Sequence, residues 1–293
     1  MSGAPQGRFL SDGQRLHLQH GPIDLIVEAF GAVDEVETAY RQAWRRFQTI
    51  LQEIVDELPL LRRPLGEAYP LSRGAVAQRM VKAVWPHRQR YITPMAAVAG
   101  SVADEMMAAL TAGRALTKAY VNNGGDIALR LAPGQSLRLG IVANQDMPTL
   151  DAFGEINHSD PIRGIATSGW RGRSQSLGIA DAATVLARSA AEADAAATMV
   201  ANAVNVDHPA VTRMPANFLR DDSDLGHLPV TTDVGPLPEA AIGYALKNGK
   251  SEATRLRRIG LLESAFLALQ GQFETIVDDC EQEETAGRTK AWT

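Results

Sequence analysis

Residues 164–206 read GIATSGWRGRSQSLGIADAATVLARSAAEADAAATMVANAVNV, and this stretch decides the fold expected for the chain. Its small-residue loop at 166–169 ends in a glycine, which lets a ligand approach the backbone closely. The β-branched and apolar run from Ala183 to Leu186 is typical of a buried strand. Ser189 has a glutamate three residues later, a capping-box sequence that predicts a helix from there to about Val204.

Three polar residues recur along this predicted helix. Asp194, Thr198 and Asn202 are spaced i, i+4 and i+8, so they stack on one helix face. A carboxylate, a hydroxyl and an amide are costly to bury without polar partners. Oxygen ligands of this kind suit a hard cation such as magnesium. The spacing is equally compatible with a stripe that faces solvent or caps a neighbouring element.

Composition excludes several classes of protein. With 45% hydrophobic and 22% charged residues, the 293-residue chain has enough apolar material for a full core. Its net charge of −5 provides no basic field for nucleic acid. Cys280 is the sole cysteine, so an intrachain disulfide is excluded and a reducing compartment is favoured. Neither a signal-peptide core nor a long uncharged apolar run occurs, so we expect a cytoplasmic protein without membrane spans.

The first half of the chain mixes hairpins with helices. Asn122-Asn123-Gly124-Gly125 separates two apolar runs and is a strong hairpin sequence, with amides and side chains available to a nucleotide. Thr93-Pro94 predicts a helix with a hydroxyl cap and proline in its first turn. The elements expected before residue 160 are strands at 15–20, 23–29, 118–121, 126–131 and 137–143, helices at 33–58, 74–84 and from 94, and a polar loop at 144–160.

The second half is expected to end in helices. The elements predicted beyond residue 206 are an irregular segment at 206–238 with a strand at 228–234, a helix at 239–248 ended by Gly249, a long helix at 252–279 and a flexible tail at 281–293. Strands and helices do not alternate strictly along the chain. The pattern therefore favours an α+β fold with mainly antiparallel sheets and long packed helices.

Three segments together resemble the ApbE-like superfamily, whose best-known members are FAD:protein FMN transferases. They are Asn123-Gly124-Gly125-Asp126, Ala166-Thr167-Ser168-Gly169 and Ala193-Asp194-Ala195-Ala196-Ala197-Thr198, and their order and separation agree with that superfamily. A closer likeness, covering nearly the whole chain, is to an uncharacterised branch, carried by segments 95–100, 176–178 and 224–226. The resemblance implies one ApbE-like domain over residues 1–293.

The resemblance also implies roles for the matching residues. In the transferases, the Asp and Thr of the last motif help to hold magnesium against the flavin diphosphate, which corresponds to Asp194 and Thr198 here. The other two segments are expected to contact FAD or a related flavin nucleotide. The residues so implied are Asn123, Gly124, Gly125, Asp126, Thr167, Ser168 and Gly169.

One departure from the family pattern bears on the reaction. The transferases carry His-x-x-Asp-Pro-x-Thr-Gly before the helix, whereas residues 173–182 here read RSQSLGIADA, without that histidine, proline or Thr-Gly. Transfer of FMN to a protein threonine is therefore doubtful. If the chain is an enzyme, metal-assisted phosphoryl or nucleotidyl transfer is the expected class, with Asp181 the acidic candidate for proton transfer or else a turn anchor.

Two further hypotheses stay open on the sequence. The chain could be a non-catalytic cofactor-binding or accessory protein, which the missing histidine favours. It could instead be a biosynthetic enzyme acting on another cofactor, such as a pterin. The small-residue faces at 96–101 and 190–197 fit either helix packing or a homodimer interface.

Overall fold

The computed structural model describes residues 3–141 and 152–277 and is built on a nine-stranded sheet in the order β1-β2-β3-β4-β5-β8-β9-β12-β13. Each neighbouring pair in this sheet is antiparallel. Its strands are β1 Gln6–Phe9, β2 Leu16–His20, β3 Ile23–Gly31, β4 Leu116–Asn123, β5 Asp126–Leu131, β8 Gly164–Ser168, β9 Ala182–Ala187, β12 Ser264–Leu269 and β13 Gln272–Ile276. The expected α+β class with a large antiparallel sheet is confirmed.

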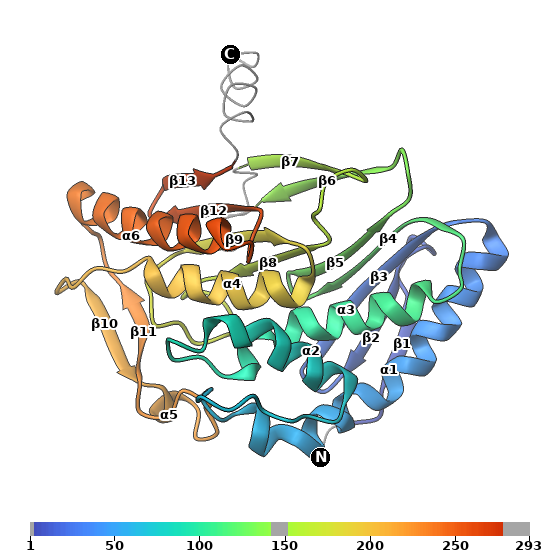
Figure 1. Cartoon of the computed structure of the whole chain (residues 1–293), viewed down its shortest axis with the longest axis horizontal. Coiled ribbons are helices and arrows are strands. Elements are labelled where there is room, and N and C mark those ends of the chain that lie inside the picture. Colours follow the sequence, from blue (N-terminus) through green and yellow to red (C-terminus); the bar gives the residue numbers. More distant parts are fainter. Residues whose placement is uncertain (1–2, 142–151, 278–293) are drawn as a thin grey trace, which may run out of the picture.

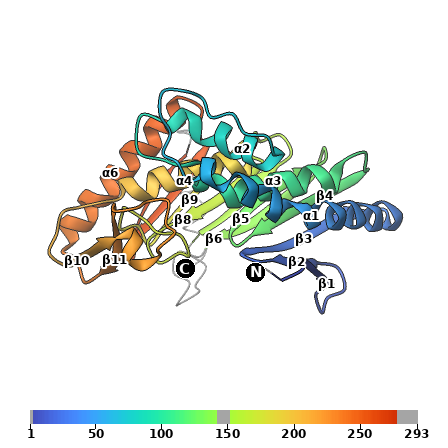
Figure 2. The same ribbon diagram turned by 90° about the horizontal axis from the view of Figure 1, so that it is seen from below.

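The long helices cover one face of this sheet (Figures 1 and 2). The helices are α1 Val33–Leu61, α2 Ala75–Val84, α3 Val98–Thr111, α4 Ala190–Ala203, α5 Ala216–Leu219 and α6 Glu239–Arg258, with short 3-10 turns η1 Trp85–His87 and η2 Pro94–Ala97. Two more antiparallel pairs complete the fold, β6 Ser136–Ile141 with β7 Ala152–Asn157 and β10 Val211–Pro215 with β11 Pro229–Val234. No helix in the described part of the chain is both long and apolar enough to cross a bilayer.

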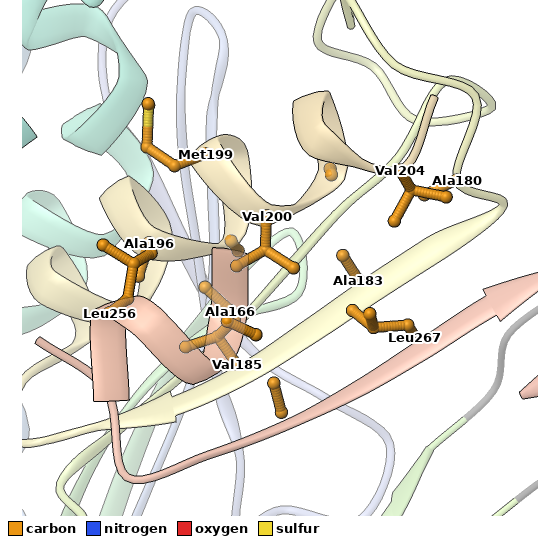
Figure 3. Packing of buried hydrophobic residues seen from close by; sticks show 14 of the residues in the cluster. Ala166, Ala180, Ala183, Val185, Ala196, Met199, Val200, Val204, Leu256 and Leu267 are labelled. Atoms are coloured by element: carbon orange, nitrogen blue, oxygen red, sulfur yellow. The ribbon is translucent and has the colours of Figure 1, made fainter. Parts of the chain in front are cut away.

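Two apolar clusters lie between the helices and the sheet. One packs α1, α2 and α3 on β2 to β5, around the fully buried Phe47, Leu18 and Met106. The other packs α4 and α6 on β8, β9 and β12. Figure 3 shows Val200 of α4, and Val204 just after this helix, on the side that faces Val185 and Leu267 of the strands. A smaller cluster covers the opposite face, where the β6–β7 pair packs on β4, β5 and β8.

Most expected elements from the first half are present. The 15–29 hairpin, the helix at 74–84 and the hairpin around Gly124 are confirmed, and the helix expected at 33–58 continues through Pro59. Ser189 caps α4 as predicted, because its side chain accepts the Glu192 N–H at 3.2 Å. The hydroxyl cap predicted at Thr93 is wrong, since that hydroxyl donates to the carboxylate of Asp224 instead.

The C-terminal prediction is wrong in its main element. The helix does not end at Gly249 but runs through it, and this position is glycine because Val204 and Leu267 pack where a side chain would stand. The long helix expected at 252–279 is replaced by the end of α6 and the β12–β13 hairpin. Gln270 and Gly271 both have positive φ, 45° and 80°, which closes a two-residue turn.

The remaining differences concern loops. Strand β10 lies within the segment expected to be irregular, and β7 lies within the loop expected at 144–160. Residues 142–151 lie outside the described part of the chain, as does the flexible tail predicted at 281–293.

Candidate functional site

Two carboxyl groups from distant parts of the chain meet at the point where α3, α4 and the β4–β5 turn converge. Asp126 begins β5 and Asp194 lies in the second turn of α4. Their side chains are partly buried and hydrogen-bond each other. Because two adjacent carboxylates repel, such a bond requires a proton between them.

Backbone amides hold both carboxyl groups in place. Asp194 accepts the N–H of Gly100 at 3.0 Å and also that of Ala99. These amides lie in the first turn of α3, where helix N–H groups have no partner within the helix. The Thr167 amide of the neighbouring strand β8 favours the charged form of Asp126 and lowers its pKa. Asp194 therefore caps α3.

Helices α3 and α4 are linked a second time, here by a carboxylate of α3 that accepts amides at the start of α4. Asp104 of α3 accepts the N–H groups of Ala190 and Ala191, at 3.0 and 2.9 Å, and so caps α4. The two helices can approach this closely because position 100 is glycine. A Cβ there would lie 2.5 Å from the carbonyl carbon of Ala190. The small-residue face of α3 thus serves helix packing, the first of the two alternatives for it.

Burial dominates the electrostatics of the carboxyl pair. Burial raises the pKa of Asp194 to about 7, and the Gly100 and Ala99 amides oppose this shift. Burial also raises the pKa of Asp126 well above its usual value, and the charge of Asp194 adds to the effect, whereas the Thr167 amide and the charge of Arg173 oppose it. At neutral pH the pair therefore keeps a proton, which a divalent cation could replace.

The β4–β5 turn forms one wall of this region. Asn123 is buried, and its Nδ2 donates to the carbonyl of Ala99 at 3.1 Å, which fixes the turn against the start of α3. Gly124 has φ +63°, and a Cβ there would lie closer than 3.0 Å to Arg173 Nη2. Gly125 also has positive φ, +115°, and its N–H donates to Asn122 Oδ1 at 2.8 Å.

The predicted loop residues of β8 lie at different positions relative to the pair. Thr167 shares its sheet face with Ile165, away from α4. Its hydroxyl forms a hydrogen bond with that of Thr184 at 2.9 Å, so only its amide acts on Asp126. Ser168 alternates with it toward the helix side. Gly169 is buried, and a Cβ there would lie 2.9 Å from the carbonyl oxygen of Ala180, so close packing explains this glycine.

The three polar residues of the stripe on α4, Asp194, Thr198 and Asn202, have different contacts. Thr198 is partly buried one turn after Asp194, and among the described residues no hydrogen-bond partner of its hydroxyl is found. Asn202 instead accepts the Leu177 N–H at 2.9 Å and the Ser176 hydroxyl at 3.3 Å. Asn202 therefore fixes the preceding loop, whereas Asp194 bonds the start of α3.

Asp181 is engaged away from this centre. Its Oδ1 accepts Trp170 Nε1 at 3.2 Å and Arg171 Nε at 3.1 Å, and its Oδ2 accepts the Gln270 N–H at 2.6 Å. Both carboxylate oxygens are thus bonded. These contacts correspond to the anchoring role given above as its alternative.

Sequence reasoning did not single out the amide donors at 99 and 100, the capping carboxylate Asp104 or the adjacent Arg173. Gly100 lies in a run of small residues that shows close packing but not the N–H groups it presents. Backbone donors carry no residue signature, so the pattern gave no signal for them. Among residues 3–141 and 152–277, no group of three or more His, Cys, Asp or Glu side chains is arranged to hold a metal.

The fold and this centre define an α+β protein with a partly buried carboxyl pair next to a glycine-rich turn. Residues 7–275 match the family described as "AbpE bacteria", and the chain belongs to that family. This confirms the family resemblance seen in the sequence.

The curated relatives of this chain include proteins that carry the name UPF0280. That of Methanococcoides burtonii is 37% identical over 164 residues, 55% of this chain and 66% of its own length. That of Methanothrix thermoacetophila is 42% identical over 118 residues, 40% of this chain and 48% of its own length. In each case the chain matches less than two thirds of the relative.

Solved structures similar to this chain include those of two flavin transferases. The apo flavinyl transferase ApbE of Pseudomonas stutzeri is 14% identical with a TM-score of 0.45, and the alignment covers 96% of both chains. The flavin transferase ApbE of Vibrio cholerae is 12% identical with a TM-score of 0.46, over 96% of this chain and 99% of its own.

Proposed function

We propose that this protein binds a flavin nucleotide or a similar diphosphate ligand with the help of magnesium at the carboxyl pair. The observation that carries the proposal is the meeting of Asp126 and Asp194, each partly buried and each fixed by backbone amides. Burying two carboxyl groups against each other is unfavourable without a cation or a proton between them. A divalent ion supplies the charge that the pair lacks.

The donor set fits magnesium. Asp126 and Asp194 supply carboxylate oxygens and Thr198 supplies a hydroxyl one helical turn away. Magnesium keeps several waters and is held by one or two carboxylates together with substrate phosphates. A site with two carboxyl residues matches that preference, because the remaining ligands can be waters and phosphate oxygens. When bound, the ion would neutralise charge on a diphosphate.

The ligand-contacting residues of this proposal follow from the motifs and the geometry together. The Asn123–Gly125 turn presents backbone to a phosphate-bearing ligand, and Ser168 lies on the helix side of β8. Thr167 and Gly169 are proposed to act by shaping this region, since their own bonds and packing are internal. Asp181 is proposed to anchor the Trp170 segment and the Gln270 turn rather than to transfer a proton.

The proposal is tested by titrating the purified protein with FAD, with and without magnesium, beside Asp194→Asn. We expect magnesium to tighten binding of FAD by the native protein and not by the variant, by on the order of tenfold or more for a charge-assisted contact. Asp24→Asn, which removes an exposed carboxylate paired with His17, is the control and should retain the effect. Absence of FAD binding under all conditions would refute the flavin ligand.

A second candidate, a binding protein without transfer chemistry, is favoured by the absence of the family histidine from residues 173–182. Incubation with FAD and magnesium distinguishes the two candidates. Release of AMP would identify a transferase, whereas intact FAD retained on the protein would identify a binding protein.

A further inference from the structure

The loop before β9 presents an arginine to the proposed ligand region. Residues 169–178 are held at both ends, by the Trp170 N–H on the Ala180 carbonyl at 3.0 Å and by the Leu177 N–H on Asn202 Oδ1 at 2.9 Å. Between these points, Arg220 Nη2 donates to the carbonyl of Arg173 at 2.9 Å. The backbone at Arg173 is therefore fixed, while its side chain is exposed.

The Arg173 guanidinium lies against the glycine turn. It occupies the space that a side chain at position 124 would need. Within the described residues, no acceptor forms a hydrogen bond with the guanidinium. Its donors are thus available beside the carboxyl pair.

The neighbouring arginine differs in this respect. Arg171 pairs with Asp181 at 3.1 Å and stacks on the Trp170 ring at 4.5 Å, so it is engaged within the fold. Arg173 has the backbone anchor of a positioned residue and the exposed head group of a ligand-binding one. A planar guanidinium matches phosphate oxygens with paired donors, which a lysine ammonium cannot do as well.

Charge balance indicates what Arg173 would bind. A divalent cation offsets the two carboxylates and leaves no net positive charge for a ligand that is itself anionic. The additional cation beside the Gly124 turn is Arg173. We propose that Arg173 binds a phosphate group of the diphosphate ligand beside the Gly124 turn. This inference rests on the proposed function and adds to it the residue that recognises phosphate.

The experiment compares Arg173→Gln, Arg173→Lys and the control Arg188→Gln, an exposed arginine after β9 that pairs with Glu263. Each protein is titrated with FAD, with riboflavin, which lacks phosphate, and with inorganic pyrophosphate, all in magnesium. Thermal unfolding confirms that each variant is folded. Loss of one charge-assisted contact should weaken FAD and pyrophosphate binding in Arg173→Gln by about 10- to 100-fold.

Arg173→Lys should recover part of that loss, Arg188→Gln should match the native protein, and riboflavin affinity should be the same throughout. Equal FAD affinity in the native protein and Arg173→Gln, with magnesium dependence retained, would overturn the role of Arg173 and leave the proposed function standing. Equal weakening of riboflavin and FAD would also overturn it, since phosphate would not be what Arg173 recognises. Failure of the native protein to bind either FAD or pyrophosphate would overturn both proposals.

Discussion

The contact between α3 and α4 can be tested by one methyl group at position 100. In Gly100→Ala, the added Cβ would lie 2.5 Å from the Ala190 carbonyl carbon and 2.8 Å from the Ala191 nitrogen, where ordinary contact begins near 3.4 Å. Both atoms belong to backbone, so the helices must separate by roughly 1 Å rather than a side chain rotate. That separation would also lengthen the Gly100 N–H bond to Asp194, now 3.0 Å.

The expected loss combines three terms. Overpacking a core costs about 1–3 kcal/mol, and weakening a hydrogen bond to a charged group costs about 1.5–3 kcal/mol. Replacing glycine by alanine in a helix returns about 1 kcal/mol. We therefore expect Gly100→Ala to lower the free energy of unfolding by about 1.5–5 kcal/mol, measured by urea denaturation followed by circular dichroism.

The matched control is Gly243→Ala in α6. Position 243 is exposed and a Cβ there meets nothing within 4 Å, so only the propensity term applies. This variant should be more stable than the native protein by about 0.5–1 kcal/mol. If Gly100→Ala were as stable as Gly243→Ala, the close α3–α4 contact would be refuted, together with the argument that it positions the Gly100 amide.

Two other variants test buried charge. Burial lowers the pKa of His87 to about 4. Between about pH 6.5 and pH 4 the unfolded chain therefore binds a proton at this residue that the folded chain does not. Stability falls as the pH falls through that window. Replacing His87 by Gln should remove about 2 kcal/mol of the stability difference between pH 7 and pH 5, and an unchanged pH profile would contradict this account. Asp104→Asn keeps only one good acceptor for the two amides of Ala190 and Ala191. We expect its free energy of unfolding in urea to be about 1–2 kcal/mol lower than that of the native protein. A variant as stable as the native protein would show that the α4 cap is dispensable.

Local signals in the sequence were sufficient for most elements. Asn123-Gly124 between apolar runs gave the β4–β5 hairpin, and Ser189 gave the start of α4, because both depend on chemistry within a few residues. Family resemblance and helix spacing singled out Asp194 and Thr198 as expected metal ligands, and Asp126 as an expected nucleotide contact, before the fold was known. The structure adds which groups bond each of them.

The C-terminal error shows where local signals failed. Leu262, Phe266, Leu269 and Phe273 recur at helical spacing, yet Phe266 and Phe273 stack across the β12–β13 hairpin with ring centroids 5.3 Å apart. The deciding feature was the Gln270-Gly271 turn, in which Gln270 adopts the left-handed conformation that glycine favours. Its side chain accepts the Leu237 N–H at 3.0 Å, a contact that sequence spacing does not reveal.

The carboxyl pair is the feature that a purely structural explanation does not account for. Asp194 has a structural role on its own, since it caps α3 through the Gly100 amide. Asp126 does not require a carboxyl group for its structural bonds: an asparagine there could accept the Thr167 N–H and donate to Asp194 without a second group whose charge must be suppressed. The second carboxyl therefore costs stability that the fold does not need to spend, a pattern typical of sites kept for binding. A cation between the two groups removes that cost, and this is why the pair, rather than either residue alone, favours a metal-assisted ligand site.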